Sequence, residues 1–215
     1  MSIGYVRALR IVHRAYARYP ASHRLHILVR FLTCPFTRLL DEVPAGARVL
    51  EIGSGHALFA RLAVEERARE VIAVDPDLRK SLLPAPSPKI RKIAGYDACI
   101  RGTFDAVVMV DVAYRLSLED QRALFTRILT LLRPGGTFLL KEMDPAQSLK
   151  TRWTHIQEWL NDTFLGITAG SGVVYQTRGE MEATLRGIGF IDFRARAIDT
   201  GYLHPHLLYT AVKPA

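Results

Sequence analysis

The stretch Arg48-Val-Leu-Glu-Ile-Gly-Ser-Gly-His-Ala-Leu-Phe-Ala60, with Val71-Ile-Ala-Val-Asp-Pro-Asp77 after it, decides the fold. An apolar run reaches an acid, passes two glycines into a helical segment, and is followed by a second apolar run that ends in an acid. Gly53 and Gly55 allow the backbone to turn sharply and to approach a ligand with no Cβ between them. Asp75 comes at the carboxyl end of the second run, where a carboxylate can accept hydrogen bonds from ribose hydroxyls. The pattern predicts a strand–helix–strand unit that binds an adenosine-containing cofactor.

The residues after the first glycine indicate which cofactor is bound. A dinucleotide fingerprint that starts at Gly53 would need glycine at position 58, which is Leu58. The run instead resembles the Glu/Asp-x-Gly-x-Gly-x-Gly motif of class I S-adenosylmethionine-dependent methyltransferases, with Ala57 in place of the third glycine. The run Leu132-Arg-Pro-Gly-Gly136, between a predicted helix and a predicted strand, is a second resemblance to that family.

The resemblance implies an α/β fold with a Rossmann-like, seven-stranded, mostly parallel sheet whose last strand is antiparallel, with helices on both faces. It covers residues 46–142 by motif and 178–213 by pattern. We expect an N-terminal helical cap over residues 1–44 and a methyltransferase domain over 45–215, with a lid insertion at about 145–176.

The resemblance also implies positions for the cofactor. Asp97 follows the third predicted strand, where the family hydrogen-bonds the adenine amino group, although an aspartate there could equally cap the next helix. Asp111 follows the fourth strand, Phe104–Val110, and faces the cleft at the carboxyl edge of the sheet, with Tyr114 and Arg115 beside it. The cofactor-binding residues expected are Glu51, Gly53, Gly55, Asp75, Pro76, Asp97 and Asp111.

The N-terminal segment carries most of the positive charge. Residues 1–40 contain seven arginines and no acid, so only +1 of the formal +8 belongs to residues 41–215. We expect helices at about 4–19 and 22–40, the second with an apolar side of Leu25, Leu28, Val29, Leu32 and Phe36. The helices can pack as a cap with arginines in water, form a lid, or contact an anionic membrane surface or an acidic acyl carrier protein. A mitochondrial presequence is a further alternative, although serine is scarce.

The implied reaction is an in-line displacement at the methyl carbon of a sulfonium. Alignment of the acceptor and exclusion of water are the main contributions of the protein, and a base helps if the acceptor is a hydroxyl. Candidate bases are Tyr114, Glu142 and His155, the last on a predicted aromatic-rich helix at 149–164; each has an ordinary packing role as its alternative. His56, in the glycine turn, is expected to point outward. No metal is predicted, because the histidines lack metal-like spacing.

The aromatic residues of the lid and the N-terminal helices favour a hydrophobic or aromatic small-molecule acceptor, free or bound to a carrier protein. The cap also resembles methyltransferases of bacterial aryl-polyene clusters. The alternatives are an RNA methyltransferase that uses the basic N-terminus, although nucleic acid is not favoured because the segment lacks a module signature, and a non-catalytic S-adenosylmethionine-binding protein. Cys34 and Cys99 have no redox or metal spacing, and no apolar run reaches the roughly 18 to 20 residues of a membrane span, so we expect a cytoplasmic protein that can also lie at a membrane surface.

Overall fold

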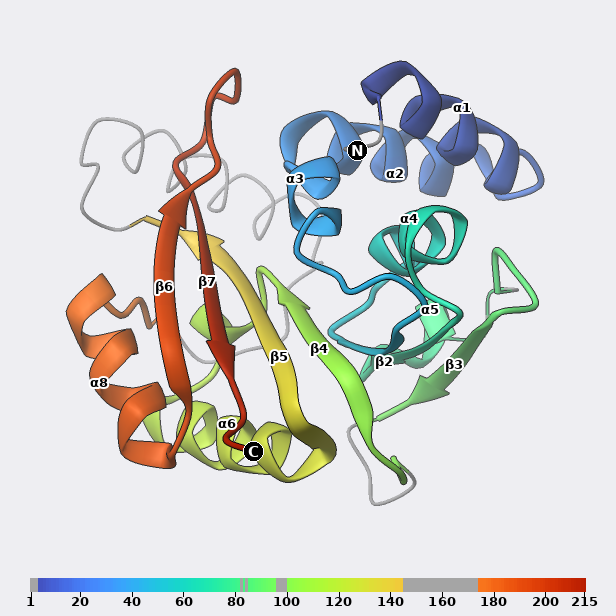
Figure 1. Cartoon of the computed structure of the whole chain (residues 1–215). Coiled ribbons are helices and arrows are strands. Elements are labelled where there is room, and N and C mark those ends of the chain that lie inside the picture. Colours follow the sequence, from blue (N-terminus) through green and yellow to red (C-terminus); the bar gives the residue numbers. More distant parts are fainter. Residues whose placement is uncertain (1–3, 82, 84, 96–99, 145–173) are drawn as a thin grey trace.

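The chain folds around one seven-stranded sheet (Figure 1). A computed structural model describes residues 4–81, 83, 85–95, 100–144 and 174–215. The strand order is β3-β2-β1-β4-β5-β7-β6, with β5–β7 and β6–β7 antiparallel and the other pairs parallel. This is the predicted sheet. The strands are β1 (Arg48–Ile52), β2 (Glu70–Asp75), β3 (Ile90–Ala94), β4 (Phe104–Val110), β5 (Leu132–Met143), β6 (Ile191–Ala197) and β7 (His206–Val212).

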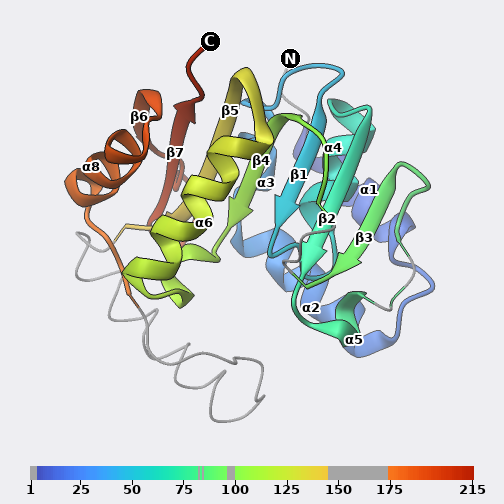
Figure 2. The same ribbon diagram turned by 90° about the horizontal axis from the view of Figure 1, so that it is seen from below.

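Alternate residues of the central strands pack into two separate cores. Val49 of β1 and Val108 of β4 belong to one core, whereas Leu50 and Val107 belong to the other. This alternation follows from the two-residue period of a strand, and it explains why the strands are apolar on both faces. Helices cover both faces, as predicted (Figure 2). The helices of the domain are α4 (Leu58–Glu66), α5 (Leu78–Ser81), α6 (Leu118–Leu131) and α8 (Arg178–Ile188), with a short 3-10 turn η1 (Ala113–Arg115).

Two helix starts are set by capping side chains. Ser117 accepts a hydrogen bond from the backbone N–H of Asp120 at the start of α6. Thr177 and Glu180 form a reciprocal capping box at the start of α8. The chain after residue 173 meets η1 beside the carboxyl end of β4, where the N–H of Val174 donates to the backbone oxygen of Tyr114 and where the candidate site lies.

The N-terminal cap differs from the prediction in its helices. The first, α1 (Tyr5–Ala15), begins where expected but ends before the expected residue 19. The predicted helix over 22–40 is wrong, because it is broken into α2 (Ala21–Thr33) and α3 (Phe36–Leu40). Cys34 has an extended backbone, with φ −120° and ψ 133°. Pro35 explains the break, since its ring disfavours helical geometry at the preceding residue.

The apolar side expected for the second helix is present, but most of it does not pack on the domain. Phe36 is buried, but the other four residues of that side are exposed, and α2 packs on the domain through Ile27 and Phe31 instead. Both sides of α2 are apolar in sequence, so helical periodicity alone does not distinguish the buried side. The exposed residues are Leu25, Leu28, Val29 and Leu32.

Hydrogen bonds attach the cap to the C-terminal strands. Arg38 of α3 donates to the backbone oxygens of Ile198 and Thr200 at 2.7 and 2.6 Å. A ring nitrogen of His206, at the start of β7, lies 2.9 Å from the backbone oxygen of Thr33. The cap is therefore held at the carboxyl edge of the sheet. No helix within the described residues has the length and apolarity needed to cross a membrane.

Candidate functional site

The two glycines of the turn after β1 have different surroundings: Gly53 is crowded and Gly55 is open. Gly53 has φ +74°, and a Cβ on it would lie 2.2 Å from Cγ2 of Val112, which follows β4. Gly55 has φ +53°, and a Cβ there would meet no atom within 4 Å. Ala57 also has a left-handed backbone, with φ 58°, so the family's third glycine position keeps its geometry with a methyl group added. Gly53 thus allows Val112 to pack closely against the turn, and Gly55 borders open space.

The two acids predicted for the cofactor occupy different environments. Asp75, at the end of β2, accepts hydrogen bonds from the backbone N–H groups of Gly55 at 2.6 Å and Asp77 at 2.9 Å. Glu51 is buried, and it accepts a hydrogen bond from the backbone N–H of Ala60 in the first turn of α4. Burial raises the pKa of Glu51 to about 8. Glu51 therefore links β1 to the first turn of α4, whereas Asp75 binds the backbone of the glycine turn itself.

The turn fits an adenosine cofactor. Ser54 is buried within it, and its hydroxyl has no hydrogen-bond partner in the described part of the chain. A carboxylate at this position can also accept hydrogen bonds from ribose hydroxyls, because each of its oxygens accepts more than one. Pro76 follows Asp75 and is exposed. A bare backbone at Gly55, a buried unpaired hydroxyl and a carboxylate are together the donors and acceptors that a nucleoside needs.

His56 does not point outward, so that prediction is wrong. It is buried under the cap, where one of its ring nitrogens lies 2.8 Å from a ring nitrogen of His23 in α2. Tyr16 donates a hydrogen bond to the backbone oxygen of His56 at 2.9 Å. Burial, the largest cause, lowers the pKa of His56 to about 3 together with the positive charge of His26, His23, Lys80 and Lys92. The imidazole is thus neutral at pH 7 and connects the cap to the glycine turn.

Asp111 lies between two cations instead of standing free in the cleft. One carboxylate oxygen is 2.5 Å from Arg30 of α2, and the other is 2.5 Å from the amine of Lys141 in β5. Burial alone would raise the pKa of Asp111, but Lys141 and Arg30 outweigh burial and hold the pKa below its usual range. Asp111 also has a left-handed backbone, with φ 55°. The network joins the cap, the end of β4 and β5.

Glu142, the next residue in β5, has one occupied and one free oxygen. Its Oε1 accepts hydrogen bonds from the backbone N–H groups of Val112 and Ala113 at 3.1 and 2.8 Å. Its Oε2 is buried with no hydrogen-bond partner among the described residues. Burial, with a smaller contribution from the negative charge of Asp111, raises the pKa of Glu142 to about 8. Val112 therefore contacts Gly53 through its side chain and Glu142 through its N–H.

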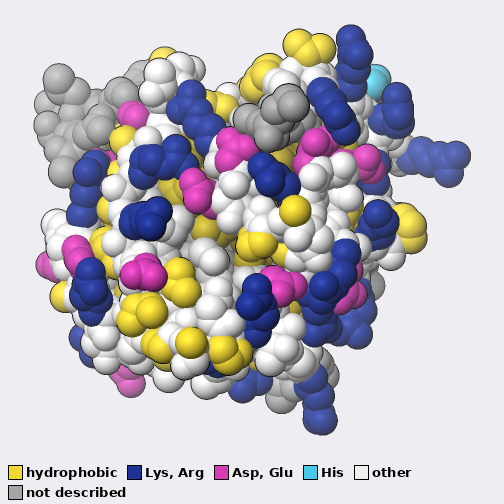
Figure 3. Space-filling model, viewed as in Figure 1, with side chains coloured by type: hydrophobic (Ala, Val, Ile, Leu, Met, Phe, Trp, Pro, Cys, Tyr) yellow, Lys and Arg dark blue, Asp and Glu magenta, His cyan; other side chains and the backbone are white. Residues whose placement is uncertain are grey.

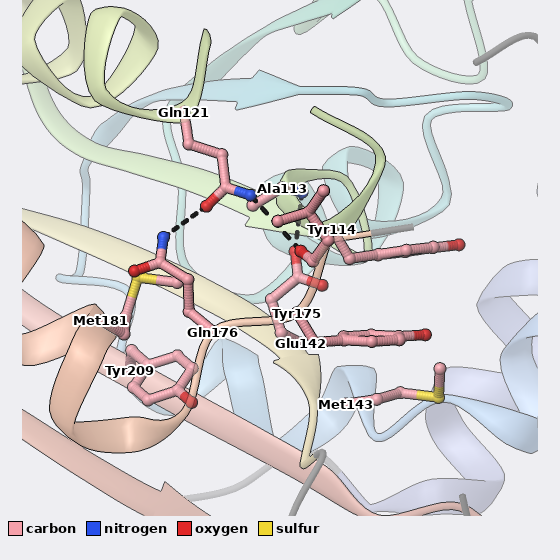
Figure 4. Close-up of a pocket in the computed structure, with 10 residues that line it drawn as sticks. Ala113, Tyr114, Gln121, Glu142, Met143, Tyr175, Gln176, Met181 and Tyr209 are labelled. Carbon is pink, nitrogen blue, oxygen red and sulfur yellow. Dashed lines mark hydrogen bonds between the residues drawn. The ribbon is translucent and has the colours of Figure 1, made fainter. Parts of the chain in front are cut away.

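A small pocket surrounds Glu142 (Figure 4). The rings of Tyr114 and Tyr175 are stacked, with centroids 5.5 Å apart and planes 10° apart. Figure 4 shows both rings and the side chain of Met143 extending in the same direction, past Glu142. Burial raises the pKa of Tyr114 to about 12, so its hydroxyl keeps its proton at pH 7. The pocket presents aromatic faces and one carboxyl oxygen.

Two glutamines fix the chain segment that supplies Tyr175. Gln176 donates to Gln121 of α6 at 2.6 Å and accepts from Thr184 of α8 at 2.9 Å. The backbone N–H of Val174 donates to the backbone oxygen of Tyr114 at 2.7 Å. The hydroxyl of Tyr209, which also lines the pocket, is buried without a partner among the described residues. These contacts hold the stacked rings over Glu142.

The structure brings together two of the three predicted catalytic candidates, Glu142 and Tyr114. His155 and Asp97 lie outside the described residues, as does most of the predicted lid. The sequence reasoning missed Ser54, Tyr175, Gln176 and Tyr209. Only Ser54, which lies within the glycine motif, had a signal in the sequence; the other three belong to no motif.

Comparisons with known proteins agree with this geometry. Residues 23–190 match a family described as "Methyltransferase domain". Similar solved structures include an S-adenosylmethionine-dependent methyltransferase of Thermotoga maritima (16% identity, 94% of this chain and 99% of that one, TM-score 0.67). A second is the S-adenosylmethionine-dependent methyltransferase SibL (19% identity, 98% of this chain and 69% of that one, TM-score 0.66). A third is the YcgJ protein of Bacillus subtilis (17% identity, 84% of this chain and 98% of that one, TM-score 0.61). No protein of curated function matches the sequence.

Gly53→Ala should destabilise the protein more than Gly55→Ala. Both add a methyl group to a left-handed residue, which costs about 1–2 kcal/mol, but only Gly53→Ala overpacks against Val112, which adds about 1–3 kcal/mol. Urea unfolding measures both losses. Val112→Ala should recover part of the loss in the Gly53→Ala background, and equal losses for the two glycine variants would contradict the close contact.

Asp111→Asn should lower the free energy of unfolding by about 3 kcal/mol, because it leaves the ammonium of Lys141 buried without a negative partner. Asparagine tolerates the left-handed backbone, so the substitution tests the charge. The double variant Asp111→Asn, Lys141→Met is the control in urea unfolding. It should lose less than Asp111→Asn alone, and an equal or larger loss would show that the ion pair does not govern stability here.

Proposed function

Because the chain belongs to the family of methyltransferase domains, we propose that it methylates a hydrophobic or aromatic small molecule and that Glu142 removes the acceptor's proton. Family membership confirms the predicted superfamily, the enzyme class and S-adenosylmethionine as the cofactor. The aryl-polyene subfamily and attachment of the acceptor to a carrier protein stay predictions.

The residues of the glycine turn support the cofactor's place. Asp75 would accept hydrogen bonds from the ribose hydroxyls, the bare backbone at Gly55 would lie against the nucleoside, and the hydroxyl of Ser54 would gain a partner. When bound, S-adenosylmethionine supplies an electrophilic methyl carbon on a good leaving group. The protein therefore has to position the acceptor, exclude water and accept one proton.

The observation that carries the proposal is the half-occupied carboxyl of Glu142. Two backbone N–H groups fix its Oε1, while its Oε2 is buried and unpaired in the pocket. A general base works best when its pKa lies near the working pH, and burial raises the pKa of Glu142 to about 8. The O–H or N–H bond of the acceptor breaks as its proton passes to Oε2. Val112 joins this base to the glycine turn, because it contacts both.

The lining of the pocket favours a flat apolar acceptor. The parallel rings of Tyr114 and Tyr175, and the side chains of Met143 and Met181, offer faces on which an aromatic ring can stack or pack. A hydrogen bond to the buried Oε2 of Glu142 would then orient the acceptor, and no charged group at the surface would be needed. The chemistry of these side chains suits a phenol or another aromatic acceptor with an ionisable hydrogen, and the pocket, with a cavity volume of about 10 Å³, would have to widen around Glu142 to admit it.

Asp75→Asn should weaken binding of S-adenosylmethionine and of S-adenosylhomocysteine by about 10- to 100-fold. The reason is that hydrogen bonds to a charged acceptor contribute about 1.5–3 kcal/mol each, and the amide offers a single neutral acceptor oxygen. Gly55→Ala should weaken both ligands as well, because its methyl group enters the open side of the turn. Isothermal titration calorimetry of the purified chain measures both effects.

Asp77→Asn is the matched control, since Asp77 lies two residues further and pairs with Arg79 at the surface. It should bind both ligands as the wild type does. Wild-type affinity in Asp75→Asn would refute the placement of the ribose, whereas tight binding with no methyl transfer to any acceptor would identify a non-catalytic cofactor-binding protein.

Glu142→Gln should lower the rate of methyl transfer by about 10²–10⁴-fold, the usual contribution of a general base. The wild-type rate should rise with pH through about 8 and then level, because only the deprotonated carboxylate accepts a proton. The variant should lose that dependence. The measurement is transfer of a labelled methyl group to a panel of phenols and other aromatic acceptors across pH.

Glutamine keeps an oxygen that can accept from Val112 and Ala113, so the fold and the cofactor affinity should not change. Tyr209→Phe, which removes the unpaired hydroxyl of the same pocket, separates general damage to the pocket from loss of the base. A Glu142→Gln variant with the wild-type rate and pH profile would eliminate Glu142 as the base.

A further inference from the structure

The outer side of the cap is unusually apolar. Leu25, Leu28, Val29 and Leu32 of α2 are 64, 39, 49 and 47% exposed, and their spacing puts them on one side of the helix. Tyr5 and Val6 of α1 are 44 and 61% exposed. We call these six residues the cap face. They include six of the nine large hydrophobic side chains that are exposed in the described part of the chain, so the exposure is concentrated there.

The two helices of the cap face lie side by side. The ring of Tyr5 lies 5.1 Å from the ring of Phe31, which places the first turn of α1 against the last turns of α2. Phe31 and Ile27 are buried on the inner side of α2, where Arg30 also reaches Asp111. The exposed leucines are therefore on the side that faces away from the domain, and the fold leaves them in contact with solvent.

Positive charge surrounds this apolar side. Residues 1–40 contain no acid, and four exposed arginines of α1, α2 and the segment between them have no ion pair within the described residues. These are Arg10, Arg14, Arg18 and Arg24. Figure 3 shows hydrophobic side chains at the top of the molecule, over the N-terminal helices, with Lys and Arg side chains next to them. Aliphatic residues beside arginines, on the outside of a helix, are typical of segments that lie in the interface of an anionic bilayer.

We propose that the cap face binds the surface of an anionic lipid membrane. The leucines of α2 enter the boundary between headgroups and acyl chains, and the arginines of α1 and α2 contact lipid phosphates. A fluid bilayer accepts a convex helix surface, whereas a folded partner would need a matching groove. The proposal does not depend on the methyl acceptor, and it gives the basic N-terminus a role that the candidate site does not use.

Sedimentation of the purified full chain with vesicles tests the proposal. Binding to phosphatidylcholine vesicles that contain phosphatidylglycerol should exceed binding to pure phosphatidylcholine vesicles by at least about tenfold, and it should fall as salt screens the charges. Leu28→Ser with Leu32→Ser should reduce binding to the anionic vesicles by at least about tenfold. Arg10→Gln with Arg14→Gln should reduce it as well.

The control is Leu118→Ser with Ile191→Ser, which removes exposed apolar side chains away from the cap and should leave vesicle binding unchanged. All variants change exposed residues, and circular dichroism verifies that they fold. Equal binding to both vesicle types, no binding, or equal losses in the cap and control variants would overturn the proposal. If the wild type dimerises, fails to bind vesicles and becomes monomeric in Leu28→Ser, Leu32→Ser, the cap face is an interface between copies of the chain.

Discussion

The ion pairs of Asp111 with Arg30 and Lys141 determine much of the site's shape. They bring a helix of the cap and a buried amine of β5 to the point where β4 ends. With the backbone of Asp111 turned into the left-handed region, the next two N–H groups meet the carboxyl of Glu142. A buried charge pair costs desolvation, and it persists where its geometry serves another purpose. Here that purpose is the position of the turn after β4 between the glycine turn and the pocket.

The sequence predicts the sheet well because its signals are local. The apolar runs, the glycines of the turn and the run Leu132-Arg-Pro-Gly-Gly136 all act over a few residues. The cap was predicted less well, for two physical reasons. Pro35 breaks a segment that reads as one amphipathic helix, and α2 is apolar on two sides, so only tertiary packing decides which side is buried.

The candidate site was predicted where a motif exists and missed where contacts are long-range. Asp75 and Glu142 follow from their places at strand ends. The bond between Arg30 and Asp111 spans 81 residues, and that between His23 and His56 spans 33, so no spacing rule indicates either one. Tyr175 and Gln176 reach the pocket through contacts of their segment with Gln121, Thr184 and Tyr114. Position within a fold, and not residue type, gives these side chains their roles.

The account's central claim is that Val112 places the cofactor turn and the pocket of Glu142 in one continuous site. The most direct measurement is a crystal structure of the chain with bound S-adenosylhomocysteine. The account predicts that the ribose hydroxyls lie within hydrogen-bond distance of Asp75 and that the sulfur faces the space between Val112 and Glu142. A nucleoside bound away from Asp75, or a sulfur separated from Glu142 by the body of the sheet, would contradict it.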